Sequence, residues 1–233
     1  YFTWYGFFEI IYNIPSIPYF NLKSDWKLPL YKIYSDDEDV DLITKIIRRG
    51  KQWAIGPEIE EFEKNLADYV DTEYCVTLNS GTSALHSTFL AYGLTKGDDV
   101  IVPSFSFIST ANSVQFVGSN PIFADIEEET YGLDPSSILN NLTSTTKAIM
   151  PMDYGGMSCN IFDIKAIAEE HDLILIEDAA EGLGSSIKGK KTGSLADSAI
   201  FSFCGNKVLT TGEGGAVVTD SKEIYEKIKL IRS

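Results

Sequence analysis

The sequence has little positive charge and few metal-binding side chains. Its 233 residues include 34 Asp or Glu and 19 Lys or Arg, which gives a formal net charge of −15. Because nucleic acids and anionic membranes are bound by clustered Lys and Arg, this balance argues against both as partners. Only two histidines and three cysteines are present, and Cys75, Cys159 and Cys204 are far apart. We therefore expect no disulfide framework and no metal site, and the cysteine content fits a reducing cytoplasm.

A long uninterrupted hydrophobic run is also absent. The first 22 residues are rich in aromatic side chains, but Glu9, Pro15 and Pro18 interrupt them, and neither a basic leading segment nor a cleavage site of small residues is present. We therefore expect no membrane anchor, and we treat residues 1–27 as an N-terminal extension of unknown role. Because the first residue is Tyr rather than Met, we expect that the chain was processed, trimmed or cut from something larger.

Helical and strand-like patterns alternate from about residue 35 to the end of the chain. The segment 35–51 begins with acidic residues, continues with an apolar stripe and reaches Gly50, which is typical of an amphipathic helix that stops there. A second helix is expected to begin at Pro57. Further helices are expected at residues 81–93, 109–118, 135–142, 160–172 and 221–233, and strands at residues 74–78, 99–103, 121–125, 147–151, 173–178, 198–203 and 213–219.

Many of the strand-like runs are apolar at every position rather than at alternate positions. This pattern is typical of strands whose two faces are both covered by helices. We therefore predict an α/β fold with a doubly wound, mostly parallel sheet, in which the strand at 213–219 is the candidate for running in the opposite direction. In such sheets, ligands bind beside the carboxyl ends of the strands, so the residues after each strand are the candidates for a site.

Two candidates follow the strands at 74–78 and 173–178. Ser80, Gly81 and Thr82 open a helix, where free backbone N–H groups and hydroxyl groups can hold a phosphate. Taken alone, these residues are more typical of an ordinary helix cap, since Ser and Thr begin many helices that bind nothing. Asp178 ends a buried strand, where an acid is costly unless it meets a cation or a good donor. The alternative is that Asp178 caps a following helix.

The third candidate is Lys207, which follows the strand at 198–203. Its neighbours Phe203, Val208 and Leu209 are apolar, and partial loss of solvent would make its neutral amine available to a carbonyl group. The glycines at 212, 214 and 215 allow tight turns and close approach of the backbone. The alternative is a solvated lysine in a flexible loop. An anion site, an acid and a sheltered lysine together are what pyridoxal phosphate requires for its phosphate, its ring nitrogen and its aldehyde.

The motifs "NSGTSAL", "VIVPSFSFISTANSV", "LILIEDAAEGLGSS" and "GNKVLTTGEGG" resemble the DegT/DnrJ/EryC1/StrS family of pyridoxal-phosphate-dependent sugar aminotransferases. The resemblance runs from about Leu28 to the last residue. It implies that residues 28–233 are the cofactor-binding large domain of a fold type I enzyme, with a seven-stranded, mostly parallel sheet in three α/β/α layers. It also implies that the chain ends before the family's smaller C-terminal domain.

The resemblance assigns roles to individual residues. Lys207 matches the lysine that binds the cofactor's aldehyde and moves the substrate proton, and Asp178 matches the acid beside the ring nitrogen. Glu181 stands near the ring oxygen, where the family usually has Gln or His, and a carboxylate there would be repelled unless one group is protonated. Asp153 stands where many members have His and some have Asp. Ser80, Gly81, Thr82 and Ser202 match phosphate-binding positions, and Phe107 matches the aromatic residue stacked on the ring.

The implied reaction is transfer of an amino group from glutamate to a nucleotide-linked keto-sugar, with a perosamine-type 4-keto-6-deoxy sugar as the best match. Its products go into surface polysaccharides and other glycosylated products. The family's site lies at a homodimer interface, so we expect this piece alone to bind cofactor weakly and to have little or no activity. One alternative is a truncated, non-catalytic homologue that binds the cofactor or a sugar. Another is a sugar dehydratase of the same fold, although that branch replaces the lysine with histidine and Lys207 argues against it.

Overall fold

The computed structural model describes residue 28 and residues 31–233. The expected N-terminal extension, residues 1–27, lies outside the described residues. Residues 33–233 form one unit of the chain, and the predicted domain boundary at residue 28 stays a prediction. Among the helices of the described residues, none has the length and apolar character needed to cross a membrane.

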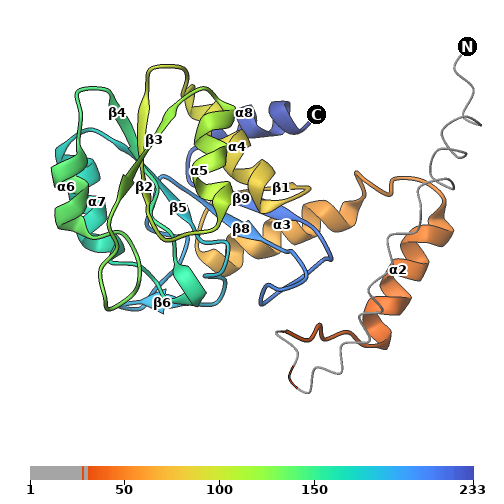
Figure 1. Ribbon diagram of the computed structural model, residues 1–233. Helices are drawn as coiled ribbons and strands as arrows, with labels where there is room; N and C mark the ends of the chain where they lie inside the picture. Colours follow the sequence, from red (N-terminus) through yellow and green to blue (C-terminus); the bar gives the residue numbers. More distant parts are fainter. Residues whose placement is uncertain (1–27, 29–30) are drawn as a thin grey trace, which may run out of the picture. The chain divides into compact units, whose positions relative to one another are not determined.

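A seven-stranded sheet with the order β1-β9-β8-β5-β4-β2-β3 forms the centre of this unit (Figure 1). Strand β9 is antiparallel to both of its neighbours, β1 and β8, and the other four pairings are parallel. This confirms the predicted mostly parallel sheet and the reversed direction of one strand. The strands are β1 (Tyr74–Leu78), β2 (Asp99–Pro103), β3 (Asn120–Ala124), β4 (Thr146–Ile149), β5 (Ile174–Asp178), β8 (Ser198–Ser202) and β9 (Gly215–Thr219).

The helices lie where the sequence predicts them, within a few residues. They are α2 (Asp37–Arg49), α3 (Pro57–Val70), α4 (Gly81–Tyr92), α5 (Ile108–Phe116), α6 (Pro135–Asn141), α7 (Ile161–Glu170) and α8 (Lys222–Arg232). A short hairpin of β6 (Ser186–Ile187) and β7 (Lys190–Lys191) and a 3-10 turn, η1 (Tyr154–Gly156), were not predicted. Helix α2 has the expected acidic cap and ends at Gly50, and none of its residues is buried.

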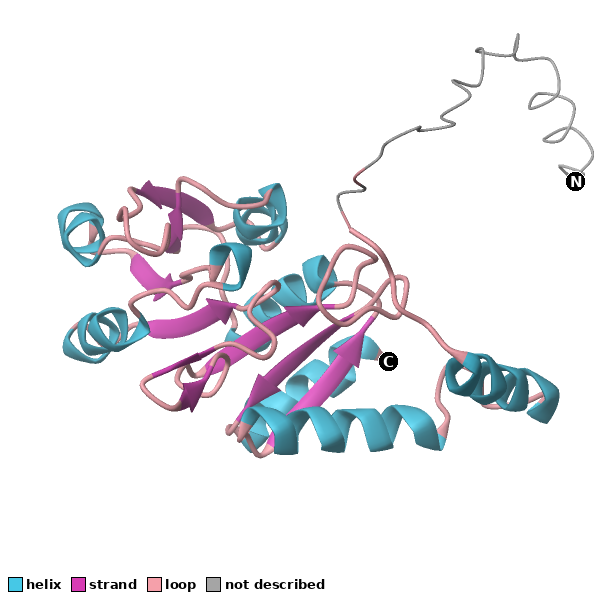
Figure 2. Ribbon diagram, turned by 90° about the horizontal axis from the view of Figure 1, so that it is seen from below, coloured by secondary structure: helices cyan, strands magenta, loops and turns pink. Residues whose placement is uncertain are grey.

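Helices cover both faces of the sheet (Figure 2). Successive residues of a strand point to opposite faces. In β8, Ile200 packs into the cluster beneath α4, α5 and α8, whereas Ala199 and Phe201 pack on the other face beside α3. Helices α6 and α7 cover that second face over β2, β4 and β5. Because both faces are buried, the strands are apolar at successive positions, and the predicted three-layer arrangement is confirmed.

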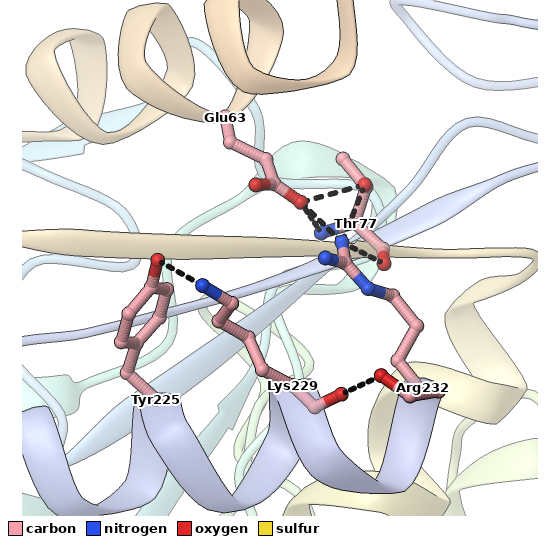
Figure 3. A network of polar contacts seen from close by, with 6 residues as sticks. Glu63, Thr77, Tyr225, Lys229 and Arg232 are labelled. Atoms are coloured by element: carbon pink, nitrogen blue, oxygen red, sulfur yellow. Dashed lines mark hydrogen bonds and ion pairs between the residues drawn. The ribbon is translucent and has the colours of Figure 1, made fainter. Parts of the chain in front are cut away.

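A polar network joins the end of α8 to β1 and α3 (Figure 3). Arg232 Nη1 donates to Glu63 Oε1 at 2.5 Å and lies 3.3 Å from the Thr77 carbonyl oxygen. Glu63 Oε1 also accepts hydrogen bonds from the backbone N–H and the hydroxyl of Thr77, both at 2.8 Å. The side chain of Glu63 is only 12% exposed. The network therefore supports the strand that leads into the turn at Ser80.

The first residue of β9 lies against that same turn. A Cβ atom on Gly215 would be 2.4 Å from the carbonyl carbon and oxygen of Ser80 and 2.6 Å from Gly81 N. These contacts involve backbone atoms, which cannot move aside as a flexible side chain can. Only glycine at position 215 therefore allows β9 to pair with β1 and β8 while α4 begins where it does.

We expect Gly215→Ala to displace the start of α4 and to lower the free energy of unfolding by about 3 kcal/mol. Urea denaturation measures this loss. The control is Gly189→Ala in the β6–β7 turn, where φ is +78° and no atom lies within 4 Å of the added Cβ. There, backbone strain alone should cost about 1 kcal/mol. Equal losses in the two variants would contradict the steric explanation.

Candidate active site

Six parallel strands end at one edge of the sheet, and the loops after five of them lead to the predicted site residues. Strands β1, β2, β4, β5 and β8 run in the same direction, so the loops that follow them meet there. These loops carry the predicted site residues Ser80, Gly81, Thr82, Phe107, Asp153, Glu181 and Lys207, and the ends of β5 and β8 carry Asp178 and Ser202. The hydrogen bonds described below connect the loops to one another.

The beginning of α4 is surrounded by hydroxyl groups. Ser80 is the N-cap residue, and its Oγ accepts a hydrogen bond from Ser83 N at 3.0 Å, so the capping alternative is correct for this side chain. A Cβ on Gly81 would lie 3.0 Å from Ser202 Cβ and 3.2 Å from Ser202 Oγ, which places Ser202 against the first helical turn. Thr82 Oγ1 lies 2.7 Å from Ser109 Oγ, at the start of α5. A helix N-terminus with hydroxyl groups on both sides is suited to an anion.

Ser109 was not predicted as a site residue. It lies in the motif "SFSFIST", directly after a strand, and its position at the start of a helix was the available signal. The sequence contains many such Ser and Thr residues, so only the contact with Thr82 distinguishes it.

Asp178 is buried at the carboxyl end of β5, with 3% of its surface exposed. Thr110 Oγ1 donates to Asp178 Oδ2 at 2.8 Å, and Ala180 N donates to Oδ1 at 3.3 Å. The residues after Asp178 form turns and not a helix, so the helix-capping alternative is wrong. Burial raises the pKa of Asp178, whereas the Thr110 and Ala180 hydrogen bonds and the charge of Lys207 oppose that rise.

Lys207 is held by an ion pair. Its Nζ lies 2.9 Å from Glu181 Oε1, its side chain is 15% exposed, and Glu181 Oε2 accepts a hydrogen bond from Gly155 N at 2.8 Å. The alternative of a solvated lysine in a flexible loop is therefore wrong. Of the apolar neighbours predicted to shelter it, Phe203 is buried at 2% exposure, whereas Val208 is 81% exposed. The amine itself is held by Glu181, in the turn after β5.

Phe107 lies at the N-cap of α5 and is 67% exposed, so its ring is available to a ligand at this edge. Nearby, the rings of Phe105 and Tyr154 lie 4.3 Å apart between centroids. Within the described residues, no group of three His, Cys, Asp or Glu side chains could hold a metal ion. What the edge offers is an anion site, a buried acid, a paired lysine and an exposed aromatic ring.

Comparisons with known proteins extend the resemblance seen in the motifs. GDP-perosamine synthase of Caulobacter vibrioides is 44% identical over 179 residues, which cover 77% of this chain and 48% of that protein. The spore coat polysaccharide biosynthesis protein SpsC of Bacillus subtilis is 38% identical over 195 residues, which cover 83% of this chain and 50% of that protein. This chain therefore spans about half the length of the curated relatives it matches.

Among solved structures, NtdA from Bacillus subtilis with bound cofactor PMP superposes with a TM-score of 0.79 and 36% identity. The match covers 86% of this chain and 46% of NtdA. The sequence model of the DegT/DnrJ/EryC1/StrS aminotransferase family matches residues 34–233. The chain therefore belongs to the DegT/DnrJ/EryC1/StrS aminotransferase family.

Proposed function

We propose that this chain carries the pyridoxal-phosphate site of a nucleotide-sugar aminotransferase. The observation that carries the proposal is the placement of Lys207 and Asp178. A largely buried lysine in the loop after β8 and a buried acid at the end of the neighbouring strand β5 lie close enough that the charge of Lys207 opposes the rise that burial gives to the pKa of Asp178. A covalently bound pyridine cofactor requires one amine and one carboxylate with this relation.

The surrounding residues fit the cofactor. Asp178 is a buried acid with two hydrogen-bond donors and no ion-pair partner within 4 Å in the described part of the chain, so a protonated ring nitrogen would supply the missing positive charge. The start of α4 would hold the phosphate, and Phe107 would lie on the ring. In the bound state the cofactor supplies an electron sink. The proposed phosphate-binding residues are Ser80, Gly81, Thr82 and Ser202. The contact of Thr82 with Ser109 adds a further hydroxyl group at the same place.

The substrate proposal rests on the relatives. The identity to GDP-perosamine synthase supports a nucleotide-linked 4-keto-6-deoxy sugar as the amino acceptor, with glutamate as the donor. The likeness to a spore coat polysaccharide biosynthesis protein supports a role in making surface polysaccharide. For the whole protein we further propose a homodimer in the cytoplasm. Residues 28–233 would be its cofactor-binding domain.

Glu181 would accept the proton that Lys207 loses during cofactor binding. Burial by itself raises the pKa of Glu181, but hydrogen bonds from Lys207 and Gly155 and the charge of Lys207 outweigh it, and the pKa is lowered. Lys207 must give up a proton before its nitrogen can attack a carbonyl, and Glu181 Oε1 is the neighbouring acceptor. Once the lysine charge is gone, burial favours the protonated carboxyl. A protonated Glu181 would meet the cofactor's ring oxygen without repulsion.

Lys207→Ala tests the cofactor site. We expect the unmodified chain, incubated with pyridoxal phosphate, to show the visible or near-ultraviolet absorption band of an imine. Borohydride should remove this band and leave the cofactor attached to Lys207, and glutamate should convert the unreduced cofactor to its amine form. The variant should lose the band and at least 100-fold in any transfer of ¹⁵N from labelled glutamate to a keto-sugar. The exposed Lys222→Ala is the matched control. A reducible cofactor adduct on Lys207 that glutamate does not convert would favour the non-catalytic homologue, and loss of water from the sugar without nitrogen transfer would favour a dehydratase.

Glu181→Gln tests the ion pair without any cofactor. A carboxyl group whose pKa is lowered below its ordinary value of 4.5 stabilises the fold above that pH, and the contribution is lost as the pH falls through the lowered value. The variant should therefore be less stable than the unmodified chain by about 1 kcal/mol at pH 7, and the difference should shrink as the pH falls below 4.5 and vanish below the lowered pKa. Denaturant unfolding across this range measures it. Glu128→Gln, at an exposed position, should show no such difference.

A further inference from the structure

A second pair of carboxyl groups lies behind the candidate site. Asp153 follows β4 and is 0% exposed, and Glu177 precedes Asp178 in β5 and is 1% exposed. The parallel pairing of Met152 with Asp178 places Asp153 and Glu177 on the same face of the sheet, and each carboxyl group acts on the pKa of the other. Neither group makes an ion pair with a Lys, Arg or His within 4 Å in the described part of the chain. Two negative charges in contact, buried and without a cation, would be strongly unfavourable.

The backbone donors around the pair satisfy only one oxygen of each group. Cys159 N donates to Asp153 Oδ1 at 2.8 Å, and Gly193 N donates to Glu177 Oε2 at 2.8 Å. Asp153 Oδ2 is buried and receives no hydrogen bond from any N–H or O–H group of the described residues. A Cβ on Gly182 would lie 3.0 Å from this oxygen and 2.6 Å from Thr192 Cγ2, so the space around it is closed. A proton between the two carboxyl groups is the donor that would satisfy Asp153 Oδ2.

We propose that Asp153 and Glu177 share one proton in the folded chain, and that this proton ties the loop after β4 to β5 beneath the turn that carries Glu181. The pair thereby acts as a positioning element for the site. Asp153 N already donates to the Asp178 carbonyl oxygen at 3.1 Å, and Asp178 N donates to the Pro151 carbonyl oxygen at 2.8 Å. The shared proton adds a side-chain link to this backbone pairing.

The electrostatic surroundings agree with this geometry. Burial raises the pKa of Asp153 to about 6, with a further rise from Asp178, whereas hydrogen bonds from Cys159 and Glu177 oppose it. Burial and the nearby Asp153 raise the pKa of Glu177 well above its ordinary value. The Cys159 thiol adds no charge, because burial and these two acids raise its pKa well above the ordinary range. The charges of Lys207 and Glu181 act on Asp178, the residue after Glu177.

For the reaction proposed above, the shared proton has a consequence. Asp153 and Asp178 raise each other's cost of ionisation, so neutralising one charge in the pair leaves Asp178 as the acid that ionises toward a ligand. This consequence rests on the proposed function. The sharing of the proton does not, because it is a property of the chain without cofactor.

Unfolding at a series of pH values tests the proposal on the full chain without cofactor. A carboxyl pair that holds a proton in the folded state and loses it in the unfolded state stabilises the fold at low pH, and the stability falls as the pH rises from about 4 to about 6. In this window the unfolding equilibrium constant should rise about tenfold per pH unit from this pair. Glu177→Gln and Asp153→Asn each replace the shared proton by an N–H donor, and both variants should lose this part of the pH dependence.

The exposed Glu61→Gln is the matched control and should retain the whole pH dependence. If the Gln and Asn variants retain it as well, the proposal is wrong. Should the variants not fold, ¹³C NMR of the side-chain carboxyl groups of the unmodified chain decides the question. One proton should remain on Asp153 or Glu177 at pH 5, and ordinary titration of both groups near pH 4 would overturn the proposal. Neither measurement involves pyridoxal phosphate, so failure of the cofactor test would leave this result unaffected.

Discussion

Two consecutive acids, Glu177 and Asp178, end a strand that is buried on both faces, and the site is organised around the cost of that burial. Successive strand residues point in opposite directions, so the two carboxyl groups need separate partners. Asp178 meets Thr110 from α5, with the charge of Lys207 nearby. Glu177 meets the backbone of Gly193 and the carboxyl group of Asp153. Asp178 therefore lies near a positive charge, whereas Glu177 lies near a second carboxyl group, although the two acids are neighbours in the chain.

The antiparallel strand β9 determines which loops can meet these acids. Strand β9 lies between β1 and β8 and separates the turn after β1 from the end of β8. The two nevertheless come together above the first residue of β9. They converge because Gly215 has no side chain: the backbone of Ser80 lies directly over it, and Gly81 reaches Ser202. The loop that precedes β9 in the chain carries Lys207, whose backbone N–H donates to the Cys204 carbonyl oxygen at 3.0 Å. Close backbone packing at Gly215 therefore brings the start of α4 and the loop of Lys207 to the same edge.

The sequence was sufficient to predict the order of helices and strands, the parallel sheet and the edge at which the site lies, because these follow from hydrophobic pattern and turn residues. Contacts between distant segments could not be predicted. The bond from Thr110 to Asp178 joins residues 68 positions apart, and no local pattern distinguishes Thr110 from other helix-start threonines. The pairing of Glu181 with Lys207 likewise joins segments that are 26 residues apart, and the sequence did not predict it. Apolar neighbours such as Val208 predicted shelter for the lysine, but Val208 is exposed.

The charges at this edge limit how an anion could bind there. Asp153, Glu177, Asp178 and Glu181 supply four carboxyl groups, whereas Lys207 forms an ion pair with Glu181 alone, and its charge acts on Asp178. A phosphate would therefore be held by neutral donors, namely the first backbone N–H groups of α4 and the hydroxyls of Thr82, Ser109 and Ser202. Donors of this kind act over short distances, so their placement must be accurate to a fraction of a hydrogen-bond length. The close packing of the start of α4 against β9 would meet this requirement. A proton kept on the carboxyl pair would further favour anion binding by reducing the local negative charge.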